Sequence, residues 1–318
     1  MSDVDTYLLA AERKNTQRSY RAALQHFEAE WGGLLPASAE TVARYLAEHA
    51  QAFALSTLQQ RLAALADWHK AHGFADPTKS PLVRKVLKGI RTLHPMPQKQ
   101  ALPLQLEQVT QIVAWLDQAI AAAGSAGRRA EQLRHTRDRS LLLLGFWRGF
   151  RGDELARLHV EHIDAVSGQG MTCFLAQSKG DREARGRTFK APALRTLCPV
   201  EAYLAWIALS GLDAGPVYRA VDRWGHVGAD GLHINSLVPL LRALFHAAGI
   251  PLAGQYSSHS LRRGFASWAT SNGWDLKTLM DYVGWRDVHS AMRYMDAADP
   301  FIGMRPMSPP GTGGGAGD

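Results

Sequence analysis

Apolar side chains recur every three or four positions along the first 93 residues, the spacing that places them on one face of a helix. We predict that this part of the chain is entirely helical, with four helices. Capping residues mark their starts, because Asn, Ser and Thr side chains accept hydrogen bonds from the first backbone amides of a helix. The predicted starts are Asn15-Thr16, Ser38-Ala39, Ser56-Thr57 and Ser80-Pro81, and the inward stripes include Tyr20, Leu24, Phe27, Trp31, Val42, Tyr45, Leu46, Leu58, Leu62, Leu65, Trp68, Val83, Val86, Leu87 and Ile90.

Residues 94–103 (HPMPQKQALP) interrupt this helical pattern with three prolines in ten residues. Because proline cannot continue a helix, we predict an extended linker here. It separates a helical N-terminal domain of residues 1–93 from a second domain of residues 104–306. Residues 307–318 are rich in Gly and Pro, and we predict a flexible tail.

The second domain begins with helical stripes and then changes period. One stripe consists of Val109, Ile112, Val113, Leu116 and Ile120, and a further helix runs through residues 141–147 after a loop at 124–129. Between about residues 162 and 193 apolar and polar positions alternate, which indicates a strand through 171–176, a turn at 179–181 and a returning strand at 188–191. We expect helices to resume at Pro199 and to dominate to about residue 296. The predicted fold class is mainly α with a small antiparallel β-sheet.

Composition places the chain among globular proteins and adds a charge that suits a polyanion. Its 318 residues suffice for two domains, and 46% of them are hydrophobic. The net charge of +7 suits nucleic acid, although charge alone fits a basic soluble enzyme equally well. Cys173 and Cys198 lack zinc-site spacing, the N-terminus is polar and acidic, and no apolar run approaches the ~18–20 residues of a membrane span. We therefore expect a reduced cytoplasmic protein that does not enter membranes.

Three short runs carry candidate chemistry in the second domain. They are residues 149–155 (GFRGDEL) with Arg151, residues 258–264 (SHSLRRG) with His259 and Arg262, and residues 283–296 (VGWRDVHSAMRYMD) with Trp285 and Tyr294. In this order they closely resemble the tyrosine recombinase, or phage integrase, family, and the tryptophan variant looks like the Cre branch. The resemblance covers about residues 10–300 and is more specific in the C-terminal half. It implies a helical core-binding domain followed by an α+β catalytic domain.

The resemblance implies that Tyr294 is the nucleophile that attacks a DNA phosphate. A phenol has a pKa of about 10, so it needs a partner for its proton and cations around the phosphate. Arg151 and Arg262 would hold the non-bridging oxygens, since arginine stays charged and its planar fork suits phosphate. His259 lies three residues before Arg262, on the same helix face, and can hydrogen-bond the phosphate or accept the tyrosine proton. A lone tyrosine is more often a core residue, but Gly284-Trp285 upstream favours the catalytic interpretation.

Three further residues complete the predicted site. Trp285 stands where most of the family has histidine, and its indole N–H can donate a hydrogen bond but cannot shuttle a proton. Glu154 would orient Arg151, whereas Asp153 is expected to face solvent. Lys179, at the predicted turn, would be the general acid for the departing 5′ oxygen, with Lys190 on the returning strand as its competitor.

The N-terminal domain is expected to grip DNA. Residues 15–21 and 87–91 resemble weakly the start and end of the family's core-binding domain. Lysine and arginine would hold phosphates, and glutamine could read base edges, although a solvated helix face explains any one of these residues equally well. The predicted DNA-binding residues are Arg18, Arg21, Gln59, Gln60, Arg61, Lys85, Lys88, Arg91 and, in the second domain, Arg263.

The family resemblance also implies partners and a reaction cycle. The expected partner is double-stranded DNA with an inverted-repeat site, bound by four protomers on two sites, with a monomer in the absence of DNA. Residues 299–306 would pack on a neighbouring protomer, with a tail folded back on its own domain as the alternative. No sequence pattern suggests a metal site or a nucleotide-binding loop, so we expect no cofactor. The alternatives are a type IB topoisomerase, a telomere resolvase, or an inactive DNA-binding protein on the same fold, while a serine hydrolase is disfavoured because no Gly-x-Ser-x-Gly motif occurs.

Overall fold

The computed structural model describes residues 14–95, 100–176, 186–285, 287–288 and 291–292. Its contacts divide the chain into two compact units, Met1–Lys99 and Gln100–Asp318. The division falls within the proline-rich segment 94–103. The roles of the two parts as core-binding and catalytic domains, and the bounds of the tail, stay predictions.

The first unit consists of short helices. They are α2 (Lys14–Gln25), the π-helical turn η1 (His26–Glu30), α3 (Ala39–Glu48), α4 (Leu55–Ala71), the 3-10 turn η2 (Pro77–Lys79) and α5 (Pro81–Leu93). Ser38 and Ser80 cap α3 and α5 as predicted, since their hydroxyls accept from backbone amides of the first turn.

Two of the predicted helix starts are wrong. Asn15 and Thr16 lie inside α2, which already includes Lys14. Ser56 and Thr57 lie inside α4, because the carbonyl of Ala54 already accepts from the amides of Thr57 and Leu58. Ala54, with extended backbone, is therefore the N-cap of this helix and provides no side-chain cap. Because Ser56 and Thr57 carry hydroxyls that could cap a helix, the predicted start lies two residues too late.

The core of the first unit forms where the predicted stripes meet. Aromatic and aliphatic side chains from α2 through α5 interlock, and the buried set is Phe27, Val42, Ala43, Tyr45, Leu46, Ala50, Leu58, Leu62, Leu65, Val83 and Ile90. Tyr45 is fully buried yet keeps its hydroxyl satisfied, because it accepts from Arg61 Nη1 (2.9 Å) and lies 2.9 Å from His26 Nδ1.

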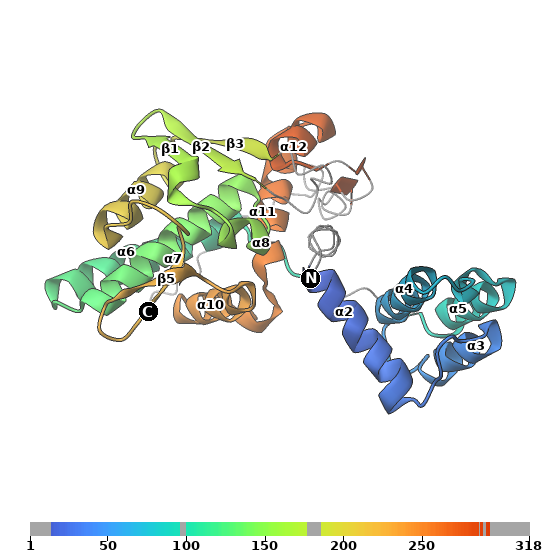
Figure 1. Ribbon diagram of the computed structural model, residues 1–318. Helices are drawn as coiled ribbons and strands as arrows, with labels where there is room; N and C mark the ends of the chain where they lie inside the picture. Colours follow the sequence, from blue (N-terminus) through green and yellow to red (C-terminus); the bar gives the residue numbers. More distant parts are fainter. Residues whose placement is uncertain (1–13, 96–99, 177–185, 286, 289–290, 293–318) are drawn as a thin grey trace, which may run out of the picture. The chain divides into compact units, whose positions relative to one another are not determined.

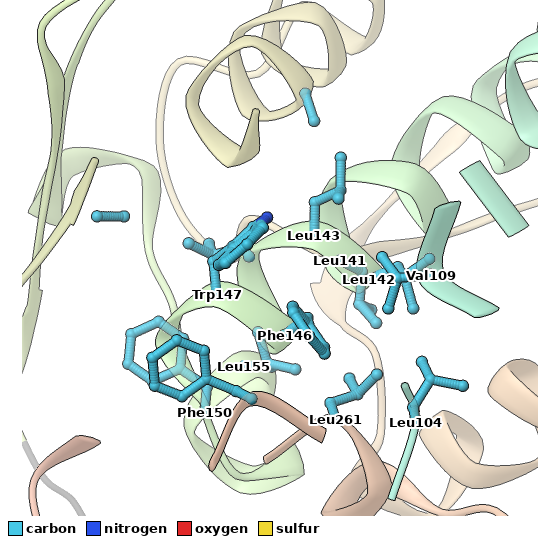
Figure 2. Close-up of a cluster of buried hydrophobic side chains, with 14 of the residues drawn as sticks. Leu104, Val109, Leu141, Leu142, Leu143, Phe146, Trp147, Phe150, Leu155 and Leu261 are labelled. Carbon is cyan, nitrogen blue, oxygen red and sulfur yellow. The ribbon is translucent and has the colours of Figure 1, made fainter. Parts of the chain in front are cut away.

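The second unit is built around one long helix. Its helices are α6 (Leu106–Ser125), α7 (Arg129–Arg148), α8 (Gly152–Ala156), η3 (Val160–His162), α9 (Pro199–Ser210), α10 (Ile234–Ala247), η4 (Ala253–Gln255), α11 (Ser258–Ser271) and α12 (Leu276–Val283). α7 passes between the others, so its run Leu141–Leu144 is buried on every side (Figure 1). Figure 2 shows side chains from α6, α8 and α11 gathered around the C-terminal half of α7. This packing fixes the end of α7, where Arg151 follows.

A three-stranded antiparallel sheet covers one side of this unit. Its order is β1 (Ile163–Val166), β2 (Gly170–Leu175) and β3 (Arg187–Pro192), with Cys173 opposite Phe189. The alternation in β2 and the return in β3 are confirmed, and residues 171, 173 and 175 face inward. The mainly α fold class with a small antiparallel sheet is thereby confirmed as well.

A second, two-stranded sheet was not predicted. β4 (Arg219–Val221) pairs with β5 (Val227–Gly231) and interrupts the helices, which otherwise dominate from Pro199 to Val283 as expected. These strands are too short to show an apolar alternation, and the hairpin depends on its turn. There the Asp222 carboxylate accepts from the amides of Trp224 and His226.

None of the helices in the described part of the chain is long and apolar enough to cross a membrane.

Candidate active site

Arg151 lies at the sharp turn between α7 and α8. α7 ends at Arg148, and Gly149 has left-handed backbone geometry (φ 56°) that closes the helix. A Cβ at Gly149 would lie 3.3 Å from Val283, so the glycine also lets α12 approach this turn. Arg151 then takes extended geometry as the N-cap of α8, with its side chain 26% exposed.

Glu154 joins both candidate arginines. Its Oε2 accepts from the Arg151 amide (2.7 Å), and its Oε1 accepts from Arg151 Nη1 (2.8 Å). The same carboxylate lies 3.7 Å from Arg262 Nη1, although Arg262 is 108 residues further along the chain. Glu154 is almost fully buried. The contact by which it would orient Arg151 is therefore present, and Asp153 instead pairs with Arg157 near the surface.

Arg262 is fully buried on α11, behind Arg151. Its Nη1 donates to the carbonyl of Gly149 (2.6 Å), which ties α11 to the turn after α7. α11 itself is fixed from the other side, because the amide of Leu104 donates to the Ser260 carbonyl (3.0 Å). Gly264 lets the Leu104 backbone pass so closely that a Cβ there would meet the Leu104 carbonyl oxygen at 1.8 Å.

His259 lies in the first turn of the same helix and is exposed, unlike Arg262. Its amide donates to the hydroxyl of Ser257, the N-cap of α11. Arg262 follows His259 by three positions, so both side chains leave α11 on one side, the arginine at depth and the imidazole at the surface.

Trp285 reaches the site from α12. Gly284 ends that helix with left-handed geometry (φ 82°), and Trp285 follows it with its ring buried. The Arg262 guanidinium carbon lies 5.0 Å from the centroid of the indole ring, which is within cation–π range. The structure thus brings Arg151, Glu154, Arg262 and Trp285 together from three different elements.

Two of the predicted catalytic residues, Lys179 and Tyr294, lie outside the described residues. The competing Lys190 is exposed on β3, opposite Thr172 in the register of the sheet.

The electrostatics of this cluster favour an anion. Arg151 and Arg262 both face the carboxylate of Glu154, so these three side chains together carry one positive charge in a partly buried place. Arginine holds its charge under such conditions and presents paired donors that match phosphate oxygens. A phosphate diester is a suitable ligand for this arrangement.

The predicted DNA-binding residues of the first unit differ in their surroundings. Gln60 donates to the Ser19 carbonyl (3.1 Å) and also contacts the Ser19 hydroxyl. Arg61 donates to Tyr45 and stacks over Phe53, with its guanidinium carbon 4.2 Å from the ring centroid. Both side chains therefore make contacts internal to this unit.

The other predicted DNA-binding residues lie at the surface. Lys85, Lys88 and Arg91 share one face of α5, opposite the buried Val83 and Ile90. Arg18, Arg21 and Gln59 are also exposed, whereas Arg263, on α11, is partly buried and donates to the Gln100 side chain.

Sequence reasoning missed two cations near these sites. Arg84 lies on the basic face of α5 with Lys88 and Arg91, and helical spacing alone could have identified it. Arg148 ends α7 and is buried, which its position beside the first motif does not reveal.

No group of three or more His, Cys, Asp or Glu side chains suited to a metal occurs in the part of the chain that is described. Glu161, which the sequence places between His159 and His162, accepts from His159 Nδ1 and from the Gly215 amide. A hydrogen bond from its own backbone amide, followed by those from His159 and Gly215, lowers the pKa of the Glu161 carboxyl to about 2.

Comparisons with known proteins converge on one family. The profile of the Phage integrase family matches residues 232–300, which include α11 and α12. The integrase/recombinase xerD homolog of Selenomonas ruminantium is 27% identical over 296 residues, covering 90% of this chain and 83% of the relative. The Recombinase cre of Escherichia phage P1 is 25% identical over 303 residues, with 90% and 83% covered.

The fold is shared with solved structures. The Tn1549 transposon integrase in complex with transposon right end DNA has a TM-score of 0.62 at 12% identity, covering 89% of each chain.

Proposed function

This chain belongs to the phage integrase family of tyrosine recombinases, and we propose that it cleaves and rejoins DNA at specific sites. Strand cleavage proceeds through a 3′-phosphotyrosyl intermediate, and strand exchange through a Holliday junction. The observation that carries the proposal is the partly buried cluster of Arg151, Glu154 and Arg262 beside Trp285. Their order along the sequence and their geometry both suit a scissile phosphate.

The proposed cleavage step transfers one phosphate bond. The phenolate oxygen of Tyr294 attacks phosphorus, the bond to the 5′ oxygen breaks, and Lys179 protonates that oxygen as it leaves. The phosphotyrosyl link conserves the bond, so rejoining requires only that a 5′-hydroxyl attack in return. No ATP or metal ion is consumed in this sequence.

The two arginines act on the charge that the phosphate gains in the transition state. Arg151 and Arg262 donate to the non-bridging oxygens, and Glu154 holds both guanidinium groups in place. His259, at the surface end of the cluster, accepts the tyrosine proton or hydrogen-bonds the phosphate. Trp285 donates its indole N–H and packs against Arg262, as in the Cre-like variant.

Double-stranded DNA with an inverted-repeat site is the proposed partner. The exposed basic residues of α2 and α5 contact its phosphates, while Gln59 contacts base edges or the backbone. Four protomers assemble on two sites, and a monomer exists without DNA. Residues 299–306, outside the described part of the chain, dock on a neighbouring protomer. The protein acts in the cytoplasm, at the nucleoid.

A covalent trap tests this function. A DNA site is first selected from a randomised duplex library by binding to the wild-type protein. A nick close to the cleaved bond then lets the short 5′ end diffuse away, so the covalent complex accumulates and is seen on a denaturing gel. We expect a covalent band that survives EDTA for the wild type and none for Tyr294→Phe, which still binds the duplex. A covalent band of equal intensity from Tyr294→Phe would contradict the proposal.

Two-site strand exchange separates a recombinase from the alternatives. A type IB topoisomerase relaxes supercoiled DNA without joining two duplexes, and an inactive DNA-binding protein forms no covalent band. Recombinant products from two copies of the selected site are therefore expected, and relaxation without any such product would favour the topoisomerase alternative.

A further inference from the structure

Arg148 is a buried cation that connects three elements of the second unit. It is the last residue of α7, only 2% of it is exposed, and its Nη2 donates to the carbonyl of Tyr282 in α12 (2.5 Å). Its guanidinium carbon lies 3.8 Å from the centroid of the Tyr282 ring and 5.2 Å from that of Phe189 in β3. Tyr282 returns a hydrogen bond from its hydroxyl to the Trp147 carbonyl (2.9 Å). α7 and α12 are thus joined in both directions.

A second arginine supports the same end of α12. Arg187, at the start of β3, donates from Nη2 to the Asp281 carbonyl (2.8 Å), and its guanidinium carbon lies 5.3 Å from the Phe189 ring centroid. Figure 1 shows β3 beside α12, with α11 next to it. The last turn of a helix has carbonyls without partners in the helix and the negative end of the helix dipole. Two cations therefore hold the last turn of α12, directly before Gly284 and Trp285.

Holding Arg148 at this depth is costly. Among the described residues no carboxylate forms an ion pair with it, and burial lowers the pKa of its guanidinium. Taking a charge out of water is costly, and an apolar side chain of similar volume would avoid that cost. A core that served stability alone would accept methionine here, so the cation points to a requirement for the position of α12.

We propose that Arg148 is a positioning residue for strand cleavage. It holds the end of α12 against α7, and through Gly284 it sets where Trp285 meets Arg262. The same turn of α7 leads through Gly149, whose carbonyl receives Arg262, to Arg151. One side chain thus aligns both arms of the cluster without contacting DNA. This inference rests on the proposed function.

Arg148→Met tests the inference, because methionine fills the space and removes the donor and the charge. Misplacing a catalytic group by about 1 Å costs up to about 10²-fold in rate. We expect the rate of covalent complex formation on the nicked duplex to fall about tenfold to a hundredfold, with the Kd for the same duplex within about twofold of wild type. Arg148→Lys keeps one donor for the Tyr282 carbonyl and should recover part of the rate.

Leu133→Ala provides the control for a loss of stability alone. Leu133 is buried in α7 about four turns before Arg148. Its replacement by alanine should lower the midpoint of thermal unfolding without slowing DNA cleavage by the folded protein. The inference fails if Arg148→Met cleaves within about twofold of wild type, if Leu133→Ala slows cleavage equally, or if lysine recovers nothing. If methionine prevents folding, the lysine variant decides by the same comparison of rate and Kd. Absence of any covalent band from the wild type would instead refute the proposed function itself.

Discussion

The Glu154 carboxylate is the one buried acid that faces both Arg151 and Arg262 among the described ion pairs. Removing it leaves two cations, one of them fully buried, without their carboxylate. We expect Glu154→Ala to lower the free energy of unfolding by about 3 kcal/mol, because breaking a buried pair costs far more than breaking a surface pair. Chemical denaturation measures this change.

Asp153→Ala is the matched neighbour for that measurement. Asp153 pairs with Arg157 where both side chains are partly exposed, so its loss should change stability by less than about 1 kcal/mol. Equal effects of the two variants would show that the Glu154 contacts do not stabilise the site.

Protonation of His26 should destabilise the first unit. Burial lowers the pKa of this imidazole below its ordinary value of 6.5, and the nearby charge of Arg61 lowers it further. Glu30 raises this pKa and His49 lowers it, but both effects are smaller. Because Arg61 donates to the Tyr45 hydroxyl, that hydroxyl is free to donate to an unprotonated His26 Nδ1. His26 therefore binds a proton more readily in the unfolded chain than in the folded one. The stability that unprotonated His26 contributes to the folded state is present above pH 6.5 and is lost as the pH falls below that value.

Hydrogen exchange of the α3 amides measures this effect in the full chain. Protection factors, corrected for the intrinsic pH dependence of exchange, should fall between pH 7.5 and pH 5.5, roughly the window set by an imidazole whose pKa is lowered. His26→Asn should flatten the profile, whereas His72→Asn, at an exposed position, should leave it unchanged. A wild-type profile as flat as that of His26→Asn would refute the prediction.

From the sequence we could predict which single residues form the site and which contacts they make with residues close by in the chain. The match to the family's first-arginine motif led us to expect that Glu154 orients Arg151, and the two side chains are in contact. The sequence could not predict the second contact, with Arg262, because that depends on how α11 packs against the end of α7. The depth of Arg148 escaped prediction for the same reason.

Elements were predictable where their own residues determine them. Ser38 and Ser80 mark helix starts through local hydrogen bonds, and the alternation in β2 reports its two faces. The hairpin of β4 and β5 was missed, because two contacts at its turn stabilise it. The Asp222 carboxylate accepts from the Trp224 amide, and Arg134 of α7 donates to the Asp222 carbonyl (2.9 Å). Such long-range support leaves no periodic pattern in the sequence.

Among the described glycines, Gly264 of α11 has the closest neighbour, the backbone of Leu104 just before α6. An alanine there would place its Cβ 1.8 Å from the Leu104 carbonyl oxygen, and a backbone segment cannot yield as a side-chain tip can. We expect Gly264→Ala to lower the free energy of unfolding by about 3 kcal/mol, the upper range for overpacking. Urea denaturation measures this change.

Gly254→Ala serves as the control in the same unit. Open space surrounds a Cβ at Gly254, so this variant should be neutral or stabilising by up to about 1 kcal/mol. A Gly264→Ala protein as stable as Gly254→Ala would show that Leu104 does not pack against α11 in this way.

Part of the excess positive charge of the whole molecule, +7, is concentrated on one face of α5. Arg84, Lys85, Lys88 and Arg91 occupy one face of this helix, and its sequence contains no acidic residue. If this face holds DNA phosphates, the logarithm of the DNA-binding constant falls linearly with the logarithm of the salt concentration. Each lost phosphate contact should make that slope shallower by about 0.9. We expect Arg84→Ala/Lys88→Ala to reduce the slope by about 2 and to weaken binding to selected and random duplexes alike.

Lys70→Ala is the control for this measurement. Lys70 is exposed near the end of α4, 3.9 Å from Asp76, and its loss should leave the slope unchanged. An unchanged slope in the α5 double variant would place the DNA elsewhere on the protein.

The order of the three motifs indicated the family from the sequence, whereas the geometry of the site required the fold. Arg151, Arg262 and Trp285 are far apart in the chain and meet only because α7, α11 and α12 pack together. Their separation in the sequence fixes neither their distances nor their burial.

The amino acid that becomes linked to DNA decides whether Tyr294 is the nucleophile. Trypsin cleaves after Arg293, and Arg305 is followed by Pro306, which resists cleavage, so one peptide spans residues 294–318 with Tyr294 as its only tyrosine. After trapping on the nicked duplex and digestion with nuclease and trypsin, tandem mass spectrometry should find a nucleotide on Tyr294. A nucleotide on any other residue, or a covalent complex whose 294–318 peptide carries no added mass, would show that Tyr294 is not the nucleophile.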